Sequence, residues 1–509
     1  MRNMKWLSLP IVSGIMASLP LFASAQKAPK TPDPKPYASS ITADDLKKHL
    51  YIVAGKEMEG RETATEGQRK AAAYIENHFK SLGLEPGNKG SYQMPYPVSQ
   101  DSFVRAGMKV NDQVLEYGKD FAVNSSSNYN ATQLFSELVF AGYGIVDSTR
   151  DDYGNVDVKG KLVMLVTGGP NSRNVNPFQK QAYALQKGAA AVLIIYANVQ
   201  GSRPGAKGQM SMNSGYARRI MPNVFNISET VAKSVLGSSY DSAKNGNLPA
   251  RVFPANVYLQ MQKESINIQS SNVIGFLEGT DLKDQFLVLS AHYDHLGKRD
   301  TTIYYGADDD GSGTVSILEL AEAFAKAKKE GKGPRRSIIF MTVSGEEKGL
   351  WGSRYYSDNP AYPLDKTTAD LNIDMVGRID PKRKVGDSMN YVYVVGDDKL
   401  SSDLRPISEM INKKYTKLEL DYKYNDPKDP ERIYFRSDHY NFARMGVPII
   451  FYFNGTHADY HRPTDTPDKI NYTLMAKRAQ FVFYTAWEMA NRNDMLKRDI
   501  PLNPPQRGF

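Results

Sequence analysis

The spacing of apolar positions changes along this chain, and it predicts where helices and strands form. Between residues 42 and 87, apolar residues recur three and four positions apart, which predicts amphipathic helices, the second ending at Gly83. After residue 271, short apolar runs typical of buried strands alternate with helical segments. The predicted strands are Phe286–Leu289, Ser337–Val343, Ala369–Met375, Tyr391–Val395 and Val447–Phe453, and the predicted helices are Val315–Lys329 and Leu474–Asn491. This alternation predicts an α/β fold, a three-layer α/β/α sandwich with a mostly parallel central sheet.

Residues 133–252 have a different pattern of predicted strands and helices. The predicted elements there are the strands Glu137–Phe140, Lys161–Val166 and Ala191–Ile195 and the helix Phe178–Lys187. The chain is also too long for one simple domain. We therefore expect residues 133–252 to form an inserted, smaller, β-rich α/β domain.

The amino terminus has the layout of a signal peptide. Arg2 and Lys5 precede an apolar stretch, Trp6–Phe22, and Ala23–Ala25 offers a small-residue cleavage site. A membrane anchor is the alternative, but the stretch is short for a spanning helix and two prolines interrupt it. We therefore predict cleavage after Ala25 and export to the periplasm or medium, without stable membrane insertion afterwards.

The charge of the chain is mildly positive and diffuse. There are 64 Lys and Arg residues against 56 Asp and Glu residues, a formal net charge of +8. The basic clusters at 326–332 and 413–417 resemble solvated helix ends, and no basic stripe interleaved with aromatic residues is present. These patterns argue against a nucleic-acid partner. The chain has no cysteine, so it has neither a disulfide nor a thiolate ligand.

Side chains that bind metals gather in short segments, several of them directly after predicted strands. These segments are Ala291–His295, Gly306–Gly313, Ser344–Glu347, Asn372–Asp374 and Tyr460–His461. In an open α/β sheet the ends of the strands form the ligand crevice, so the segments are expected to meet. Two divalent cations held close together need one bridging carboxylate and further His and carboxylate ligands on each side. The combination therefore predicts a two-metal hydrolase site.

One assignment satisfies both metals. If Asp308 bridges, His292 and Asp374 complete one site, and Glu347 and His461 complete the other. Nitrogen and oxygen ligands without thiolate suit two Zn²⁺ ions, although Co²⁺ or Mn²⁺ could replace them. The excess positive charge favours a bound hydroxide near neutral pH.

Two further acids have roles that follow from the chemistry. Glu346, beside Glu347, is the candidate general base that moves a proton from water to the leaving amine. Asp294, two residues after His292, is expected to hydrogen-bond that imidazole and fix its tautomer. Taken alone, a Glu-Glu pair is usually exposed and such an Asp can be a solvated residue at a strand end.

With these motifs the chain resembles the M28 metallopeptidases, a family of co-catalytic zinc aminopeptidases and relatives. Further matching motifs are Glu59–Thr63, Gly67–Ala71, Trp351–Ser353 and Ser437–His439. The resemblance implies zinc ligation by the same set, namely His292, Asp308, Glu347, Asp374 and His461. It also suggests a cis peptide bond between the bridging aspartate and its successor, here Asp308 and Asp309.

The resemblance implies roles for three more residues. Tyr460 stands where some members carry a tyrosine that stabilises the oxyanion, with an ordinary packed aromatic as the alternative. His439 and His457 are candidates for shaping the substrate pocket, or they only satisfy loop contacts.

Parts of the insertion resemble the protease-associated (PA) domain found within several M28 peptidases: Phe140–Gly144, Val156–Lys161 and Lys187–Val192. Such a domain would act as a lid or wall, or as an inert scaffold. The predicted organisation is a signal peptide at 1–25, a Pro-rich linker at 26–41, the catalytic domain at 42–132 and 253–500, the PA-like insertion at 133–252, and a tail at 501–509.

The leading functional prediction is an exported aminopeptidase acting on peptides or proteins. A carboxypeptidase, a dipeptidase or a glutaminyl cyclase remain alternatives because related folds host each chemistry. The cyclase is disfavoured because it needs only one zinc ion. A non-catalytic, receptor-like binding protein is the alternative outside the enzymes, but all five ligand positions are filled. The sequence makes no prediction of the oligomeric state.

Overall fold

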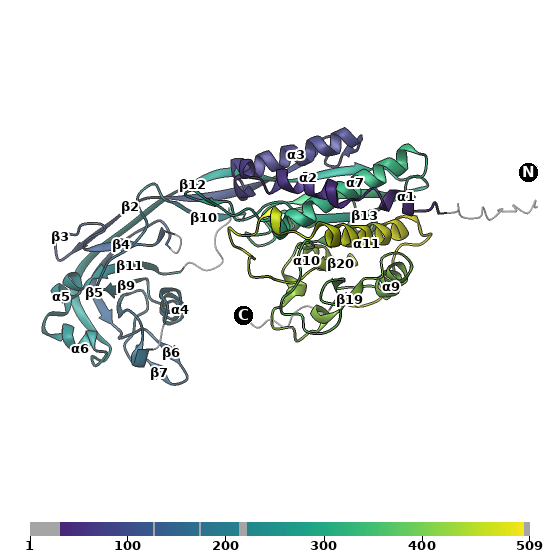
Figure 1. Cartoon of the computed structure of the whole chain (residues 1–509). Helices are drawn as coiled ribbons and strands as arrows, with labels where there is room; N and C mark the ends of the chain where they lie inside the picture. The colour runs from purple at the N-terminus through teal and green to yellow at the C-terminus, as the bar shows by residue number, and fades with distance from the viewer. Residues whose placement is uncertain (1–30, 126–127, 173–174, 213–220, 503–509) are drawn as a thin grey trace, which may run out of the picture.

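The computed structural model describes residues 31–125, 128–172, 175–212 and 221–502, which form two lobes joined by long strands (Figure 1). The predicted signal peptide, residues 1–25, lies outside the described residues, as do parts of the predicted linker (26–30) and tail (503–509). Within the described ranges, no helix has the length and apolar character needed to cross a membrane.

The larger lobe, here called the main lobe, contains the predicted mostly parallel sheet. Its strands follow the order β19-β18-β20-β17-β13-β16-β12. Four neighbouring pairs are parallel, β13 with β16, β13 with β17, β17 with β20 and β18 with β19, whereas β12–β16 and β18–β20 are antiparallel. The bounds are β12 Arg251–Leu277, β13 Leu282–His292, β16 Arg336–Val343, β17 Thr367–Ile373, β18 Tyr391–Val395, β19 Glu419–Asp421 and β20 Ile449–Phe453.

Helices cover both faces of this sheet, which confirms the three-layer prediction (Figure 1). Alternate strand residues enter different cores because successive side chains point to opposite faces. Leu287 packs in a core with α7 and α11, whereas Val288 packs in one with α8 and α10. The helices of the first face are α1 Lys35–Ala38, α2 Ala43–Val53, α3 Glu66–Leu82, α7 Gly313–Lys329, α9 Leu404–Lys414 and α11 Tyr472–Asn491; those of the second are α8 Trp351–Asp358 and α10 His439–Ala443.

The end of the predicted linker packs against the main lobe. Tyr37 is buried, its ring stacks on Trp487 with centroids 5.5 Å apart, and its hydroxyl donates to Glu330 at 2.7 Å. The indole of Trp487 in turn donates to the carbonyl of Pro32 at 3.1 Å. Residues 32–41 are therefore part of the folded lobe.

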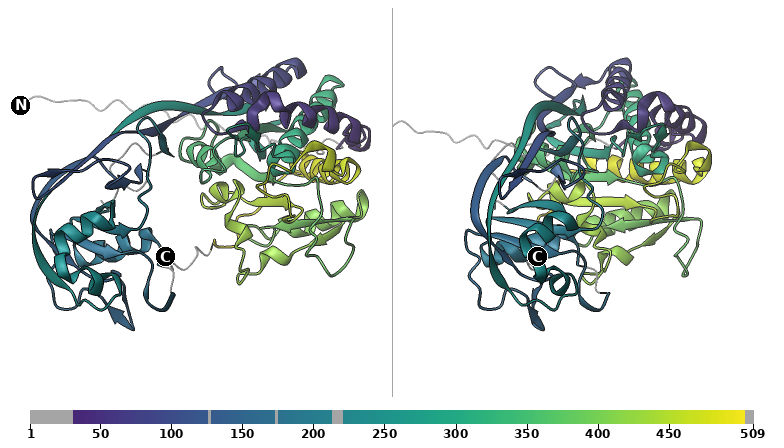
Figure 2. Two further views of the ribbon diagram at one scale, coloured as in Figure 1. Left: turned by 60° about the vertical axis from the view of Figure 1, so that its left-hand side comes forward. Right: turned by 90° about the vertical axis from the view of Figure 1, so that its left-hand side faces the viewer.

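Two long strands carry the chain between the lobes (Figure 2). Strand β12 spans 27 residues, and β2 (Gln93–Val110) pairs with it antiparallel from Val273↔Gln93 to Val257↔Val110. Between 253 and 261 alternate residues of β12 are buried, as expected for a strand with one covered face, whereas 270–275 are buried throughout. One strand thus serves both lobes.

The second lobe contains the sheet β12-β5-β8-β9-β11-β4 and the helices α4, α5 and α6. Its core includes Phe103 and Phe121 as well as Leu259, so residues on both sides of 133–252 contribute to it. The resemblance of this segment to the PA domain remains a prediction. The bounds are β4 Phe121–Val123, β5 Ala131–Phe140, β8 Leu162–Val166, β9 Ala191–Tyr196, β11 Asn223–Ser228, α4 Pro177–Lys187, α5 Glu229–Leu236 and α6 Tyr240–Lys244. The remaining short strands are β1 Glu85–Pro86, β3 Gln113–Val114, β6 Val146–Asp147, β7 Arg150–Asp151, β10 Lys207–Ser211, β14 Lys298–Arg299 and β15 Thr302–Ile303.

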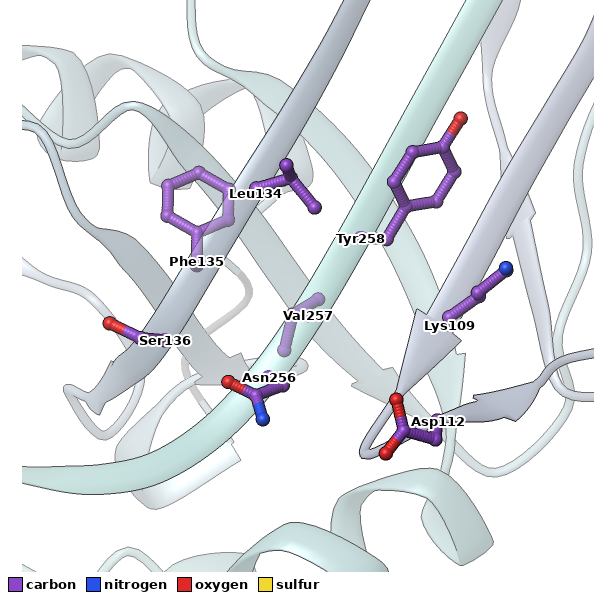
Figure 3. A pocket seen from close by; sticks show the side chains of 8 residues that line it. All are labelled: Lys109, Asp112, Leu134, Phe135, Ser136, Asn256, Val257 and Tyr258. Atoms are coloured by element: carbon purple, nitrogen blue, oxygen red, sulfur yellow. The ribbon is translucent and has the colours of Figure 1, made fainter.

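A pocket on the second lobe lies across β2, β5 and β12 (Figure 3). Its charged groups are one amine, Lys109, and one carboxylate, Asp112. Leu134, on the other side of β12, is 77% exposed (Figure 3). No histidine lines it. With one carboxylate and no histidine, this pocket lacks the donor set that the predicted two-metal centre needs.

Candidate metal centre

Four of the five predicted metal ligands, His292, Glu347, Asp374 and His461, converge where strands of the main sheet end. His292 is the last residue of β13, the two glutamates Glu346 and Glu347 follow β16, and Asp374 directly follows β17. These three strands are adjacent and parallel, so their carboxyl ends lie at one edge of the sheet. His461 reaches the same place from the segment after β20. The topology explains why residues far apart in sequence meet.

The donors form two groups that share one aspartate. Donor atoms of His292, Glu346 and Asp374 all lie within 4.8 Å of one another. Asp309 stands between this group and His461: its Oδ1 is 3.3 Å from His292 Nε2, and its Oδ2 is 3.1 Å from His461 Nε2. A carboxylate with one oxygen toward each side has the arrangement of a bridging ligand.

The second group is completed by Glu347 and by His295, which the sequence had not indicated as a ligand. Glu347 Oε2 is 3.1 Å from His461 Nε2, and Glu347 Oε1 is 2.8 Å from His295 Nδ1. Donor atoms of His295, Asp309 and Glu347 again lie within 4.8 Å of one another. His295 lies in the same His-Tyr-Asp-His run, and histidine is a common metal ligand, so the run itself held the signal for a second donor.

Asp308, the predicted bridging residue, points away from these groups. Its Oδ1 accepts from the backbone N–H of Gly377 at 2.7 Å, and its Oδ2 is 3.1 Å from His457 Nε2. The structure therefore places Asp309, one residue later, in the position that the sequence assigned to Asp308. The cis peptide bond is likewise one residue later than expected, at Asp309–Asp310.

The third aspartate of the run holds the backbone. Asp310 Oδ1 accepts from the N–H groups of Gly313 at 2.8 Å and Met375 at 3.0 Å, and its Oδ2 accepts from the N–H of His292 at 3.2 Å. Burial raises the pKa of Asp310 well above its usual value. Three consecutive aspartates thus have three different roles, because the irregular backbone turns each side chain in a different direction.

Buried polar atoms at the centre fit a cation. Among the described residues, His292 Nε2, His295 Nδ1, Asp309 Oδ2 and Glu347 Oε1 are buried and make no hydrogen bond. His295 and Glu347 approach closely, but their atoms are not aligned as donor and acceptor. Buried unpaired donors and acceptors are costly, and metal ions bound at the two groups would satisfy these atoms. The residues present fit a pair of divalent cations.

The raised pKa values of two histidines also indicate that the carboxylates of this centre favour a nearby positive charge. Burial disfavours a charged imidazole, but the carboxylates of Glu346 and Asp374 outweigh it and raise the pKa of His292 well above its usual value. At His461, Asp309 and Glu347 likewise overcome burial and raise the pKa to about 10. Divalent cations bound at the same places would provide this compensating positive charge.

The adjacent glutamates differ in proton affinity. Burial raises the pKa of Glu346 well above its usual value. Burial acts in the same direction at Glu347, but the imidazoles of His295 and His461 outweigh it and lower the pKa. Two neighbouring carboxyl groups with separated pKa values suit different tasks, one that carries a proton and one that remains an anion.

Asp294 contacts the imidazole of His292, the backbone of Glu346 and the side chain of Thr63. The Nδ1 of His292 lies 3.1 Å from the carbonyl oxygen of Asp294 and 3.7 Å from its carboxylate, so the closer contact is through the backbone. The carboxylate instead accepts from the N–H of Glu346 at 3.2 Å and from the hydroxyl of Thr63 at 2.7 Å. Asp294 is buried, which disagrees with the alternative of a solvated strand end.

The motif around residues 59–63 supplies a buried arginine beneath the centre. Arg61 donates to the carbonyls of Tyr293 at 2.7 Å, Tyr305 at 2.8 Å and Gly306 at 2.9 Å. Burial lowers the pKa of Arg61 to about 10, so it stays charged near neutral pH. Arg61 thus ties the segment after β13 to the segment before Asp308, a role that residue type alone did not reveal.

The three aromatic candidates lie in different surroundings. Tyr460 stacks on His461 with ring centroids 3.9 Å apart and lines a pocket together with Asp309 and Glu346. His439 is buried behind that pocket, with its Nε2 2.8 Å from the carbonyl of Tyr434, and burial lowers its pKa to about 3. His457, held beside Asp308, does not line the pocket either. Only Tyr460 is placed to touch a substrate.

Residues 272–486 match the model of peptidase family M28. Among characterised proteins, leucine aminopeptidase 2 of Trichophyton rubrum is 24% identical over 495 residues, covering 89% of this chain and 87% of the relative. A probable leucine aminopeptidase of Arthroderma otae is 28% identical over 275 residues, covering 49% of this chain and 72% of the relative.

Solved structures resemble most of the chain. An aminopeptidase from Aneurinibacillus sp. strain AM-1 has a TM-score of 0.54 at 19% identity, covering 94% of this chain and all of that one. A zinc aminopeptidase from Bacillus subtilis has a TM-score of 0.53 at 19% identity, covering 91% and 99%. At this identity the likeness supports the fold, including the presence of the second lobe within the compared length.

Proposed function

We propose that the protein is a zinc-dependent aminopeptidase with a two-metal centre, on the premise that residues 272–486 match the model of peptidase family M28. The observation that carries the proposal is the position of Asp309, whose two oxygens face separate groups of donors. The relatives named as leucine aminopeptidases and the solved zinc aminopeptidase support the choice of metal and substrate.

The ligand set divides between two ions. His292, Asp309 and Asp374 would hold one ion, and Asp309, Glu347 and His461 the other, with His295 beside Glu347. Bound zinc would polarise the scissile carbonyl and lower the pKa of a coordinated water. This set replaces the predicted one at a single position, Asp309 for Asp308.

The chain's own residues handle the proton and the developing charge. Glu346, whose pKa is raised by burial, accepts a proton from the attacking water and gives it to the leaving amine. Tyr460, whose pKa burial also raises, remains a phenol near neutral pH and donates a hydrogen bond to the oxyanion. Asp294 orients His292 through its carbonyl oxygen and holds the backbone of Glu346 through its carboxylate.

Preference for a free amino end is supported by the charge of the pocket. Glu346 lines it and is not one of the proposed metal ligands, so its carboxylate suits an α-ammonium group. We further propose that the enzyme acts after export, because residues 1–25 have the layout of a signal peptide. Its substrates are then peptides outside the cytoplasm.

The test is mass spectrometry of one peptide in two forms, free and amino-terminally acetylated, incubated with the zinc-loaded protein. We expect stepwise loss from the amino end of the free form and no change in the acetylated form. Trimming from the carboxyl end would identify a carboxypeptidase, and cleavage of dipeptides alone a dipeptidase. Loss of ammonia or water from an amino-terminal Gln or Glu, without peptide-bond cleavage, would identify a cyclase.

A further inference from the structure

The pocket beside the metal centre has an apolar wall and one basic side chain. Its apolar lining comes from Met375, Ile433, Phe451 and Phe453. The basic side chain is Arg436, which directly follows the short 3₁₀ helix Ile433–Phe435. The pocket therefore combines a surface for aliphatic carbons with a guanidinium group.

Arg436 has one polar contact and no acidic one. Its Nη2 donates to the hydroxyl of Tyr460 at 3.2 Å. No carboxylate of the described ranges lies within 4.0 Å of its guanidinium, in contrast to two other arginines of the main lobe: Arg378 pairs with Asp459 at 3.0 Å, and Arg405 pairs with Asp397 at 3.0 Å. The planar donors of Arg436 are thus available to a ligand.

An available arginine in a pocket rich in acids has a specific chemical consequence. Asp309 and Asp374 are assigned to the metals, so Glu346 is the one acid of the lining that is left, and a substrate carboxylate is best received by the cation Arg436. Arginine is the best protein group for this purpose because its fork of N–H donors matches a carboxylate. The apolar wall can meanwhile cover the aliphatic stem.

We propose that Arg436 binds a carboxylate of the peptide substrate and makes this pocket accept acidic substrates. This inference rests on the proposed aminopeptidase function. The carboxylate has two sources: the side chain of an amino-terminal Glu or Asp, or the carboxyl terminus of a dipeptide. Both sources present a carboxylate, and the experiment distinguishes the side chain from the carboxyl terminus.

The experiment compares kcat/KM for peptides that differ in one charge. Glu-Ala-Ala-amide and Gln-Ala-Ala-amide are nearly isosteric, and both lack a terminal carboxylate. Leu-Ala and Leu-Ala-amide differ only at the carboxyl end. We expect Arg436→Met to lower the acid-to-neutral ratio in one of these pairs by about tenfold or more, since a charge-assisted bidentate contact is lost. Arg436→Lys, which keeps the charge without the fork, should lower it less.

Arg432→Met is the matched control. Arg432 is exposed, lies four residues earlier on the same segment and does not line the pocket, so this variant should keep both ratios. A changed Glu-to-Gln ratio would identify the side chain as the source, and a changed Leu-Ala ratio the terminus. An equal loss of kcat/KM on every peptide would indicate that Arg436 only positions Tyr460, and it would overturn the inference. If the wild-type protein hydrolyses none of these peptides, the proposed function fails, and the inference fails with it.

Discussion

Glu346→Gln should lower kcat by a factor of about 10²–10⁴ and leave the fold and the bound metal in place. The side chains are nearly isosteric, but an amide cannot take a proton from water. Burial raises the pKa of Glu346, so the wild-type carboxyl can hold the proton until the amine leaves. The measurement is kcat on a free peptide together with zinc content per chain.

Glu347→Gln provides the matched comparison at the next residue. Because Glu347 faces His295 and His461, its replacement should lower zinc content as well as activity. If Glu346→Gln kept near wild-type turnover, the assignment of the general base would be wrong. If it lost zinc as Glu347→Gln does, Glu346 would be a ligand rather than the base.

Asp309→Asn should abolish retention of at least one metal ion and reduce activity to background. Each oxygen of Asp309 faces a separate group of donors, so replacing one oxygen by an NH₂ group removes a ligand and places a donor against the cation. Asp308→Asn should have a much smaller effect. Its amide oxygen can still accept from the N–H of Gly377, and the side chain does not reach the two groups.

The two variants are compared by zinc content after dialysis and by kcat/KM. We expect Asp308→Asn to keep its zinc and to lose no more than about tenfold in kcat/KM, the scale of a residue that supports a ligand indirectly. The opposite order, with Asp308→Asn losing the metal and Asp309→Asn keeping it, would restore the assignment made from the sequence.

Most of the main lobe could be predicted because its pattern is strong. The buried strands are short apolar runs, and the metal-binding segments follow directly after them, so the meeting of His292, Glu347 and Asp374 follows from parallel topology. That reasoning needs only the ends of β13, β16 and β17. The fold prediction was therefore confirmed, whereas the same reasoning could not predict which way each side chain of the loops points.

The choice among Asp308, Asp309 and Asp310 could not be made in the same way. All three residues have the same side chain. Outside helices and strands, no periodic pattern predicts which way a side chain points. Their roles depend on local hydrogen bonds, such as those from the N–H groups of Asp308 and Asp309 to Asp465 Oδ2 at 3.0 and 3.2 Å. Asp465 lies more than 150 residues away in the chain, and no sequence pattern connects it to this run.

The positions of two other residues, His439 and Arg436, could not be predicted from the neighbouring sequence. His439 follows Ser437 and Asp438 in a motif that suggested the pocket, yet its ring stacks behind Phe451 with centroids 4.6 Å apart. Arg436 belongs to no motif, and its position in the pocket depends on a turn that only the structure shows. Tertiary packing decides whether the side chain of a loop residue points into a pocket.

The most direct test of the two-metal centre is the anomalous diffraction of zinc-loaded crystals at the zinc absorption edge. Our account predicts two peaks about 3.5–4 Å apart, one on each side of the Asp309 carboxylate. The peak nearer β17 should contact His292 and Asp374, and the other should contact Glu347 and His461. A single peak, or peaks that contact the carboxylate of Asp308 instead, would contradict the account.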